Sequence, residues 1–345
     1  MNIRLLAFLF AVSLLFAACQ DDEGIPPTLG DLDNHIFIIN EGNFGQSNGS
    51  LTAISRETGV VWDNLFETVN TFRLGDVVQS MTIHNGKAYI VVNNSGKIEV
   101  VDVNTLESTA TIEGLTAPRY FLPVNDDKAY ITNITFDDPT TLDIIDLNTY
   151  EIIKTIPTAW GEQMVMSDGK VFIGIMNTYD VMVVDATTDE MLQTISVNYA
   201  PNSLQVDRNG KVWVLSEGDD YGEGTPALRR IDPVSLQTEQ VFDFADIDDR
   251  PKKLAINNAG DKLYYLEDGK VWRMDIDDEE LPQTPLITSD EHTFYGLGID
   301  PTNNNIYTTD AADYQSKGSV LYYRPDGTPI NNFEAGIIPG DFCFN

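Results

Sequence analysis

Short apolar segments alternate with polar turns along almost the whole chain, and they recur in a fixed order. Each unit contains an apolar strand, a tight turn, a strand rich in Val, Ile and Tyr, a variable loop, a strand that ends in Asp, a second turn and a last strand. A clear copy runs from 81–84 through Asn85-Gly86 to 88–92, and continues through 97–102 to 108–112. Asn-Gly and Asp-Gly tolerate the positive φ angles of tight hairpins, and the β-branched and aromatic residues beside them favour strands. The pattern therefore predicts a series of antiparallel hairpins.

The unit recurs at intervals of about 40 to 50 residues, which is typical of the four-stranded blades of a propeller. The second strands of the later copies are predicted at 129–131, 171–173, 212–214, 263–265 and 306–308. A β-helix would have a much shorter period, and a two-sheet sandwich would not repeat so uniformly. We therefore predict an all-β fold, a seven-bladed β-propeller that occupies residues 34–345 as one domain.

The two ends of this domain contain complementary halves of a unit. Residues 36–40 and 49–54 match a second and a third strand, but no innermost strand precedes them. Residues 340–344 match an innermost strand, but no second strand follows. We expect the C-terminal strand to complete the first blade, which closes the ring and leaves no exposed sheet edge there.

The first eighteen residues are typical of a secretory signal peptide. Arg4 supplies a positive charge, 5–16 form an apolar run, and Ala17-Ala18 are the small residues that a signal peptidase requires. The run ends in Phe16-Ala17-Ala18-Cys19, which resembles the lipobox of bacterial lipoproteins, where the cysteine is lipidated. The alternative is an ordinary signal peptide followed by a chance cysteine. We predict lipidation at Cys19, with the membrane contacted through the lipid anchor alone.

Residues 19–33 are predicted to form a linker between the anchor and the propeller, with Pro26-Pro27 as a spacer. The segment Gln20-Asp21-Asp22-Glu23 resembles the acidic tag of Bacteroidota lipoproteins that are sent to the outer face of the outer membrane. We therefore expect an outer-membrane, lipid-anchored protein that is exposed at the cell surface. Exposure on the periplasmic side stays open.

Charge and cysteine content exclude several classes of site. The formal net charge is −33, which argues against nucleic acid, because nucleic-acid binding needs many phosphate-neutralising Lys and Arg residues. The chain has two cysteines, Cys19 and Cys343. With Cys19 lipidated, neither an internal disulfide nor a cysteine-based metal site can form.

The two ring faces of the predicted propeller differ in their loops. One face carries short turns, and the Asp that ends each third strand is expected to accept backbone hydrogen bonds there (Asp102, Asp146, Asp185, Asp232 and Asp275). The other face carries longer loops and the blade-to-blade connections, which contain aromatic residues beside Asn, Asp or Arg. Rigid aromatics with a few polar groups are typical of a ligand site, although such aromatics also pack between blades. The candidate ligand-binding residues are Asn43, Phe44, Arg119, Tyr120, Phe136, Trp160, Tyr179, Tyr199, Tyr221, Tyr295 and Tyr314.

No known catalytic pattern is present in the sequence. The three histidines lie at 35, 84 and 292, and no His-x-x-x-His, Gly-x-Ser-x-Gly or glycine-rich phosphate loop occurs. Calcium at Glu217-Gly218-Asp219-Asp220 is conceivable, but the spacing fits no known calcium loop. We therefore expect no catalytic residue, no bound metal and no cofactor, and we interpret the chain as a binding protein rather than an enzyme.

Both ends of the domain resemble a known family. The segment 38–45 (Ile-Ile-Asn-Glu-Gly-Asn-Phe-Gly), followed by Asn48-Gly49-Ser50-Leu51, resembles the first-blade signature of a Bacteroidota family of exported seven-bladed propellers. The ending 336–342 (Gly-Ile-Ile-Pro-Gly-Asp-Phe) is similar to the end of that family. One branch consists of surface lipoproteins that bind vitamin B12 and hand it to the TonB-dependent cobalamin transporter. The resemblance implies a cobalamin-like ligand on the aromatic face and a TonB-dependent transporter as partner.

Two other functions stay open at this point. The same face could bind a partner protein, which would make the chain an interaction scaffold at the cell surface with no small-molecule ligand. A propeller enzyme of the lactonase or quinoprotein type is less favoured, because no metal or cofactor set is recognisable in the sequence.

Overall fold

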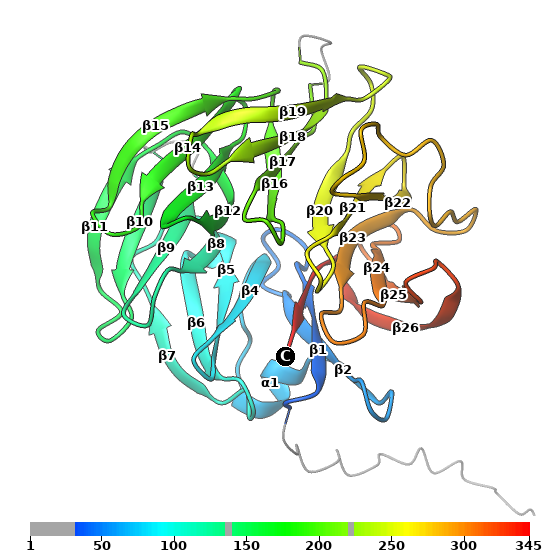
Figure 1. The fold of residues 1–345 in the computed structure, drawn as a ribbon. Helices are drawn as coiled ribbons and strands as arrows, with labels where there is room; N and C mark the ends of the chain where they lie inside the picture. Colours follow the sequence, from blue (N-terminus) through cyan, green and yellow to red (C-terminus); the bar gives the residue numbers. More distant parts are fainter. Residues whose placement is uncertain (1–31, 135–139, 220–223) are drawn as a thin grey trace, which may run out of the picture. The chain divides into compact units, whose positions relative to one another are not determined.

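The computed structural model describes residues 32–134, 140–219 and 224–345. In this part of the chain, seven antiparallel β-sheets stand around a common centre (Figure 1). We call each sheet a blade and number the blades from 1 to 7 in chain order, beginning with the blade that contains β1. The arrangement is the predicted seven-bladed β-propeller.

The strands follow one another from the centre of the ring to its rim. The innermost strands are β4 (Val78–His84), β8 (Pro118–Pro123), β12 (Gly161–Ser167), β16 (Pro201–Val206), β20 (Lys252–Ile256), β23 (Phe294–Ile299) and β27 (Pro339–Phe344). The second strands are β1 (His35–Asn40), β5 (Lys87–Val92), β9 (Lys128–Asn133), β13 (Lys170–Ile175), β17 (Val212–Ser216), β21 (Lys262–Glu267) and β24 (Ile306–Asp310). The third strands are β2 (Ser50–Ser55), β6 (Lys97–Asp102), β10 (Thr141–Asp146), β14 (Asp180–Asp185), β18 (Ala227–Asp232), β22 (Lys270–Asp275) and β25 (Lys317–Tyr323). The fourth strands are β3 (Val61–Trp62), β7 (Ser108–Ile112), β11 (Ile152–Pro157), β15 (Glu190–Ser196), β19 (Gln237–Asp243) and β26 (Pro329–Ile337).

The hydrophobic core lies between neighbouring blades. Every side chain of β1 is buried, and so are all but the first of β5, β9 and β13, because the second strands are covered on both faces. One core cluster joins Tyr89 of blade 2 to Phe121 and Ile131 of blade 3, with the rings of Tyr89 and Phe121 stacked at 4.2 Å. The rim strands β11 and β15 are mostly exposed. Each blade is therefore stabilised by its two neighbours.

The C-terminal strand closes the ring, as predicted. In the antiparallel pairing of β27 with β1, Ile36 lies opposite Phe344 and Ile38 lies opposite Phe342. Blade 1 thus has the order β27-β1-β2-β3 and combines both ends of the domain. Because the first and last strands share one sheet, opening the ring requires breaking a complete strand pair.

The two sequence motifs at the ends of the domain lie against each other. Asn40 is fully buried; it donates from Nδ2 to Ser50 Oγ (3.2 Å) and Thr52 Oγ1 (3.0 Å) and accepts from Gly336 N (3.1 Å). A Cβ atom at Gly336 would lie 2.6 Å from Asn40 Cγ, closer than such atoms can approach. The Asn and the Gly of the two motifs therefore fit each other at the closure.

Blade 6 departs from the four-stranded unit that the sequence predicts. Its sheet contains three strands, and the segment after β22 returns with a single bridge between Val271 and Ile287. This segment contains Pro282 and Pro285, which have no N–H to donate to a strand ladder. The rim of blade 6 is consequently less covered than that of its neighbours.

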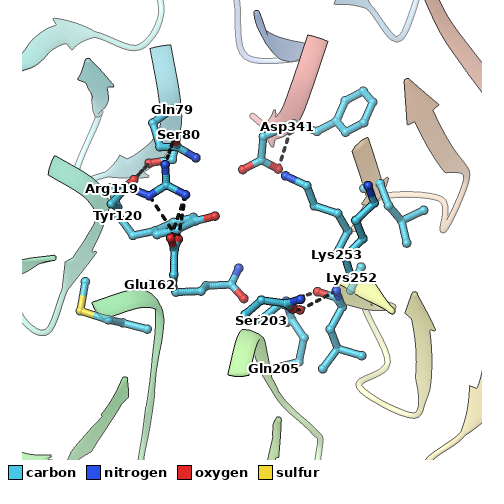
Figure 2. A pocket seen from close by; sticks show the side chains of 18 of the residues that line it. Gln79, Ser80, Arg119, Tyr120, Glu162, Ser203, Gln205, Lys252, Lys253 and Asp341 are labelled. Atoms are coloured by element: carbon cyan, nitrogen blue, oxygen red, sulfur yellow. Dashed lines mark hydrogen bonds and ion pairs between the residues drawn. The ribbon is translucent and has the colours of Figure 1, made fainter. Parts of the chain in front are cut away.

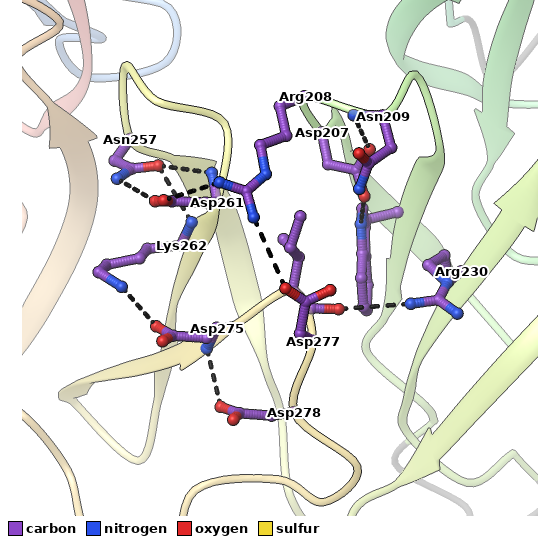
Figure 3. Close-up of polar contacts among 12 residues, drawn as sticks. Asp207, Arg208, Asn209, Arg230, Asn257, Asp261, Lys262, Asp275, Asp277 and Asp278 are labelled. Atoms are coloured by element: carbon purple, nitrogen blue, oxygen red, sulfur yellow. Dashed lines mark hydrogen bonds and ion pairs between the residues drawn. The ribbon is translucent and has the colours of Figure 1, made fainter.

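The turns of one face are held by carboxylates, as expected for most of the Asp residues that end third strands. Asp102, Asp146, Asp185 and Asp232 accept hydrogen bonds from backbone amides two or three residues ahead. Asp275 instead pairs with Lys262, and its own N–H donates to Asp278 (Figure 3).

Polar contacts also link the turns of neighbouring blades on this face. Arg208 in blade 5 forms ion pairs with Asp261 (3.3 Å) and Asp277 (3.6 Å) in and after blade 6 (Figure 3). Beside it, the Trp213 indole donates to Asp207 Oδ2 at 3.0 Å. The two ion pairs of Arg208 link the turns of blades 5 and 6.

Two short helices lie between strands. The sequence analysis predicted neither of them. The helix α1 (Leu65–Asn70) follows β3 in the chain and buries Leu65 and Phe66. The 3-10 helix η1 (Asn93–Ser95) follows β5. Among the described residues, no helix has the length and apolar character needed to cross a membrane.

Candidate functional site

The seven innermost strands surround a cavity of about 630 Å³. Each of these strands begins with a β-bulge, so that its second residue has no partner on the neighbouring second strand. A bulge turns a side chain out of the regular pleat. The seven bulges lie at the ends of the innermost strands that follow the blade-to-blade connections, so each blade offers one residue at the same end of the channel.

The second residues of the innermost strands are Gln79, Arg119, Glu162, Asn202, Lys253, Tyr295 and Gly340. All except Gly340 line the cavity. Gly340 has no side chain, and a Cβ atom there would collide with Glu41 Oε1, so Glu41 occupies the seventh place. We call Glu41, Gln79, Arg119, Glu162, Asn202, Lys253 and Tyr295 the mouth ring. Seven repeated blades thus place acidic, basic, amide and phenol groups around one opening.

Arg119 connects three blades of the mouth ring. Its guanidinium donates to Gln79 Oε1 at 2.6 Å and forms an ion pair with Glu162 Oε1 at 2.8 Å (Figure 2). Its Nε also donates to Glu162 Oε2 at 3.3 Å. The planar guanidinium can bind both carboxylate oxygens at once. This half of the ring is therefore a rigid network rather than a set of independent charges.

The opposite half of the ring is joined through Glu41 and Lys253. The Tyr295 hydroxyl donates to Glu41 Oε1 at 3.0 Å, and Lys253 Nζ donates to the Gly340 carbonyl at 2.9 Å. Lys253 belongs to blade 6 and Gly340 to blade 1, so the lysine reaches past blade 7. Its backbone has φ +58°, a left-handed conformation that is costly for a residue with a Cβ and persists only where its surroundings hold it.

Burial changes the proton affinity of several charged groups around the cavity. Burial raises the pKa values of Glu41, Glu162 and Asp341, and the nearby Lys253 or Arg119 partly offsets the effect. Burial also lowers the pKa of Lys252, whose Nζ lies 5.3 Å from the centroid of the Tyr295 ring. In such a poorly hydrated site, hydrogen bonds to a bound ligand are stronger than in water.

Below the mouth ring, polar side chains of the channel bind the next strand of the wall. Ser80 Oγ donates to the Arg119 carbonyl (2.8 Å), and Gln205 Nε2 donates to the Leu254 carbonyl (3.0 Å). Ser203 Oγ accepts from Leu254 N at 3.0 Å. These groups are engaged in holding the wall together.

The structure brings several of the predicted residues to the mouth. Arg119, Tyr120 and Tyr295 line the cavity. Tyr314 packs edge-on against Tyr295 with centroids 5.6 Å apart, and Asn43 Nδ2 donates to the Tyr314 carbonyl at 2.7 Å. These contacts connect the loops of blades 1 and 7 to the mouth ring through Tyr295.

The other predicted residues are not in the cavity wall. Phe44 is 77 % exposed at the tip of the first loop. Tyr179, in the loop between β13 and β14, forms an edge-on pair with Tyr199 of the connection between blades 4 and 5, with ring centroids 5.1 Å apart. The Trp160 carbonyl accepts from Met176 N at the start of blade 4. Two further predicted residues, Phe136 and Tyr221, lie outside the described residues.

The sequence analysis missed Glu41, Gln79, Glu162, Asn202, Lys252 and Lys253. Polar residues of this kind are common in the sequence, and their convergence depends on the bulges. One signal was nevertheless present: Arg119, Glu162 and Asn202 each follow a Pro or Gly that begins an innermost strand. Within the described ranges, no group of three or more His, Cys, Asp or Glu side chains is arranged to hold a metal ion.

Residues 34–335 match the model of a protein family described as a domain of unknown function, DUF5074. The chain belongs to this family. Because DUF5074 is described as a domain of unknown function, this match carries no activity or ligand with it. No curated protein matches the sequence significantly.

Solved structures confirm the fold of this DUF5074 domain. A quinoprotein alcohol dehydrogenase-like protein from Bacteroides thetaiotaomicron has a TM-score of 0.71 at 14 % identity, over 91 % of this chain and 79 % of the other. The periplasmic gluconolactonase of Pseudomonas aeruginosa has a TM-score of 0.69 at 14 % identity, over 90 % and 99 %. A functionally unknown protein from Desulfotomaculum acetoxidans has a TM-score of 0.69 at 11 % identity, over 90 % and 98 %. At these identities the likeness concerns the propeller and not its chemistry.

Proposed function

We propose that this chain is a lipid-anchored binding protein of the outer membrane that captures a bulky polar nutrient at its mouth ring and passes it to a TonB-dependent transporter. The observation that carries the binding role is the mouth ring itself, seven polar side chains around a cavity of about 630 Å³. Small-molecule sites have volumes of roughly 300–1,000 Å³ and orient their ligands with a few placed polar groups.

The mouth ring suits an asymmetric ligand. Gln79 and Asn202 carry amides, Tyr295 carries a hydroxyl, and Arg119 and Glu162 form a fixed pair of opposite charges. Because these groups differ around the ring, a ligand with several different polar substituents can bind in one orientation.

A cobalamin-like molecule is the ligand that we propose. The first-blade motif resembles that of a family of exported propellers that has a vitamin B12-binding branch, and two residues of the motif, Glu41 and Asn43, contribute to the mouth. A corrin carries amide side chains around a flat ring, and we propose that it lies across the mouth. Its amides would meet the mouth ring, and its flat face would meet the exposed aromatics Phe44 and Tyr314, which are 77 % and 48 % exposed.

Titration of the purified protein with cyanocobalamin tests this ligand. We expect a dissociation constant in the micromolar range or below, and Phe44→Ala should weaken binding about tenfold if this aromatic is an anchor. Val234→Ala is the matched control, because Val234 is an equally exposed apolar residue (71 %) in a turn between the third and fourth strands of blade 5. No binding at micromolar cyanocobalamin, or equal losses in both variants, would overturn the proposal.

The anchor and the transporter need separate tests. Export and lipidation predict that a labelled fatty acid is incorporated into the protein and that Cys19→Ala abolishes the incorporation. Co-purification from detergent-solubilised outer membranes should recover a TonB-dependent receptor with the protein. Recovery of a partner without any cobalamin binding would favour the second candidate, a protein-interaction scaffold, which the exposure of Phe44, Tyr179 and Tyr314 on the mouth face supports.

A further inference from the structure

A second cavity, of about 560 Å³, lies at the rim between blades 5 and 6 and shares no lining residue with the channel. Its walls come from the end of β19 and the following loop (241–246 and 249), from Tyr265, Glu267 and Trp272, and from the segment 279–283. The cavity exists because blade 6 has no fourth strand.

Trp272 of β22 marks the position that the missing strand would cover. The matching residues of five other blades each pair with a residue of a fourth strand (Glu99, Asp143, Met182, Arg229 and Leu321). In blade 6, only Val271 has a partner on the returning segment. The start of that segment is fixed by the ion pair of Asp277 with Arg208 and by Asp278, which accepts from Asp275 N (Figure 3). The gap beside Trp272 is therefore built into the fold.

Aromatic rings form one part of the cavity wall. The Trp272 and Tyr265 rings are nearly parallel, 4° apart in orientation with centroids at 6.5 Å, and Phe244 meets Tyr265 edge-on at 5.6 Å. The Trp272 indole N–H already donates to the Glu267 carbonyl at 3.2 Å. The polar group of the indole is thus satisfied, and what Trp272 can offer to a ligand is its ring.

Carboxylates form the other part of the wall. Six of the fifteen lining residues are acidic (Asp243, Asp246, Asp249, Glu267, Glu279 and Glu280), and no Lys or Arg lines the cavity. With 54 acidic residues among 345 in the whole chain, the average composition predicts about two of fifteen. The cavity therefore combines aromatic rings with an excess of negative charge and no compensating cation in its wall.

We propose that this cavity binds an organic cation, a small molecule whose positively charged nitrogen is carried on an apolar body. The electron-rich faces of Trp and Tyr rings attract such a nitrogen, and the carboxylates attract its charge. An inorganic cation would gain nothing from the aromatic wall, and a neutral apolar molecule would gain nothing from the carboxylates. The volume is sufficient for a small molecule.

Choline and its neutral isostere 3,3-dimethylbutan-1-ol have the same shape, but only choline carries a positive charge, so a comparison of their binding tests the proposal. Isothermal titration of the full-length purified protein should show choline binding about tenfold more tightly than the isostere, as expected for a cation that binds over an aromatic ring. Trp272→Leu and Glu267→Gln should each weaken choline binding, by about tenfold for Trp272→Leu.

One variant controls for overall charge, and one spectrum controls for the fold. At pH 8, Glu190→Gln removes the same charge as Glu267→Gln but from an exposed position on β15 in blade 4, outside the cavity wall, and it should leave choline binding unchanged. Circular dichroism of Trp272→Leu should show the wild-type β-sheet spectrum. Equal binding of choline and the isostere, no choline binding at millimolar concentration, or full choline affinity in a folded Trp272→Leu variant would each overturn the proposal. None of these results depends on what binds at the mouth ring.

Discussion

The closure of the ring makes a quantitative prediction at Asn40 and Gly336. In Asn40→Ala, the buried Gly336 N–H loses its acceptor, and Ser50 and Thr52 each lose a hydrogen bond from the amide. An unsatisfied buried N–H costs about 1–3 kcal/mol, and each lost neutral hydrogen bond about 1 kcal/mol. The Thr52 hydroxyl already lies 3.3 Å from Asp63 Oδ1, which lessens its loss. We therefore expect the free energy of unfolding to fall by about 3 kcal/mol.

Gly336→Ala perturbs the same contact from the other side. The new Cβ atom would lie 2.6 Å from Asn40 Cγ and 2.8 Å from Ser50 Oγ, and overpacking of this kind costs about 1–3 kcal/mol. In an Asn40→Ala background, the closer of these collisions disappears. The second substitution should then cost at least about 1 kcal/mol less than it does alone, because contacting residues do not act additively.

Urea unfolding, followed by tryptophan fluorescence and far-ultraviolet circular dichroism, measures the four free energies of this cycle. Gly174→Ala serves as a matched control in blade 4, where the new Cβ atom would lie 2.6 Å from the Pro201 carbonyl and far from Asn40 in the ring. Its cost should be the same in the wild-type and the Asn40→Ala backgrounds, within about 0.5 kcal/mol. Equal costs of Gly336→Ala in both backgrounds would refute our account of how the ring closes.

Three further predictions concern other buried groups. Burial and the nearby Asp249 raise the pKa of Glu267 to about 7; Asp268 raises this pKa further, and Lys270 lowers it. The stability that the neutral form of Glu267 confers is therefore present below pH 4.5 and is lost as the pH rises through about 7. Glu267→Gln should therefore be more stable than the wild type at pH 8 and equally stable at pH 4, as measured by urea unfolding, whereas Glu279→Gln, an exposed carboxylate of the same cavity, should show no such difference. Arg119→Met leaves Glu162 buried without its cation and should cost about 3–5 kcal/mol; most of that loss should return in the double variant with Glu162→Gln, and a double variant as unstable as the single one would contradict the ion pair. Burial raises the pKa of the Cys343 thiol to about 12, so the native protein should not react with Ellman's reagent at pH 8 and should react on unfolding; rapid reaction of the native protein would mean that β27 is not stably paired.

The mouth ring shows where sequence reasoning about the site ended. Arg119, Tyr120 and Tyr295 were predicted because an aromatic or cationic residue in a blade connection is conspicuous. Glu162 and Lys253 were missed because acidic and basic residues occur throughout so charged a chain. What distinguishes them is a β-bulge at the start of each innermost strand, which depends on pairing between strands that are distant from any local pattern.

The sequence by itself determined the class of fold, the number of blades and the closure, because alternating strands and Asn-Gly or Asp-Gly turns are local signals and their repetition at about 40 to 50 residues is typical of propeller blades. It also determined that the two ends share a blade, since each end held half of a unit. Only the tertiary structure decided that Glu41 takes the place of a side chain at Gly340, and that the segment after β22 forms a cavity instead of a fourth strand. The first outcome depends on the approach of residues from opposite ends of the chain. Pro282 and Pro285 explain why the segment after β22 forms no strand, but the cavity also needs the wall that blade 5 contributes, and no pattern within a single repeat encodes such contacts.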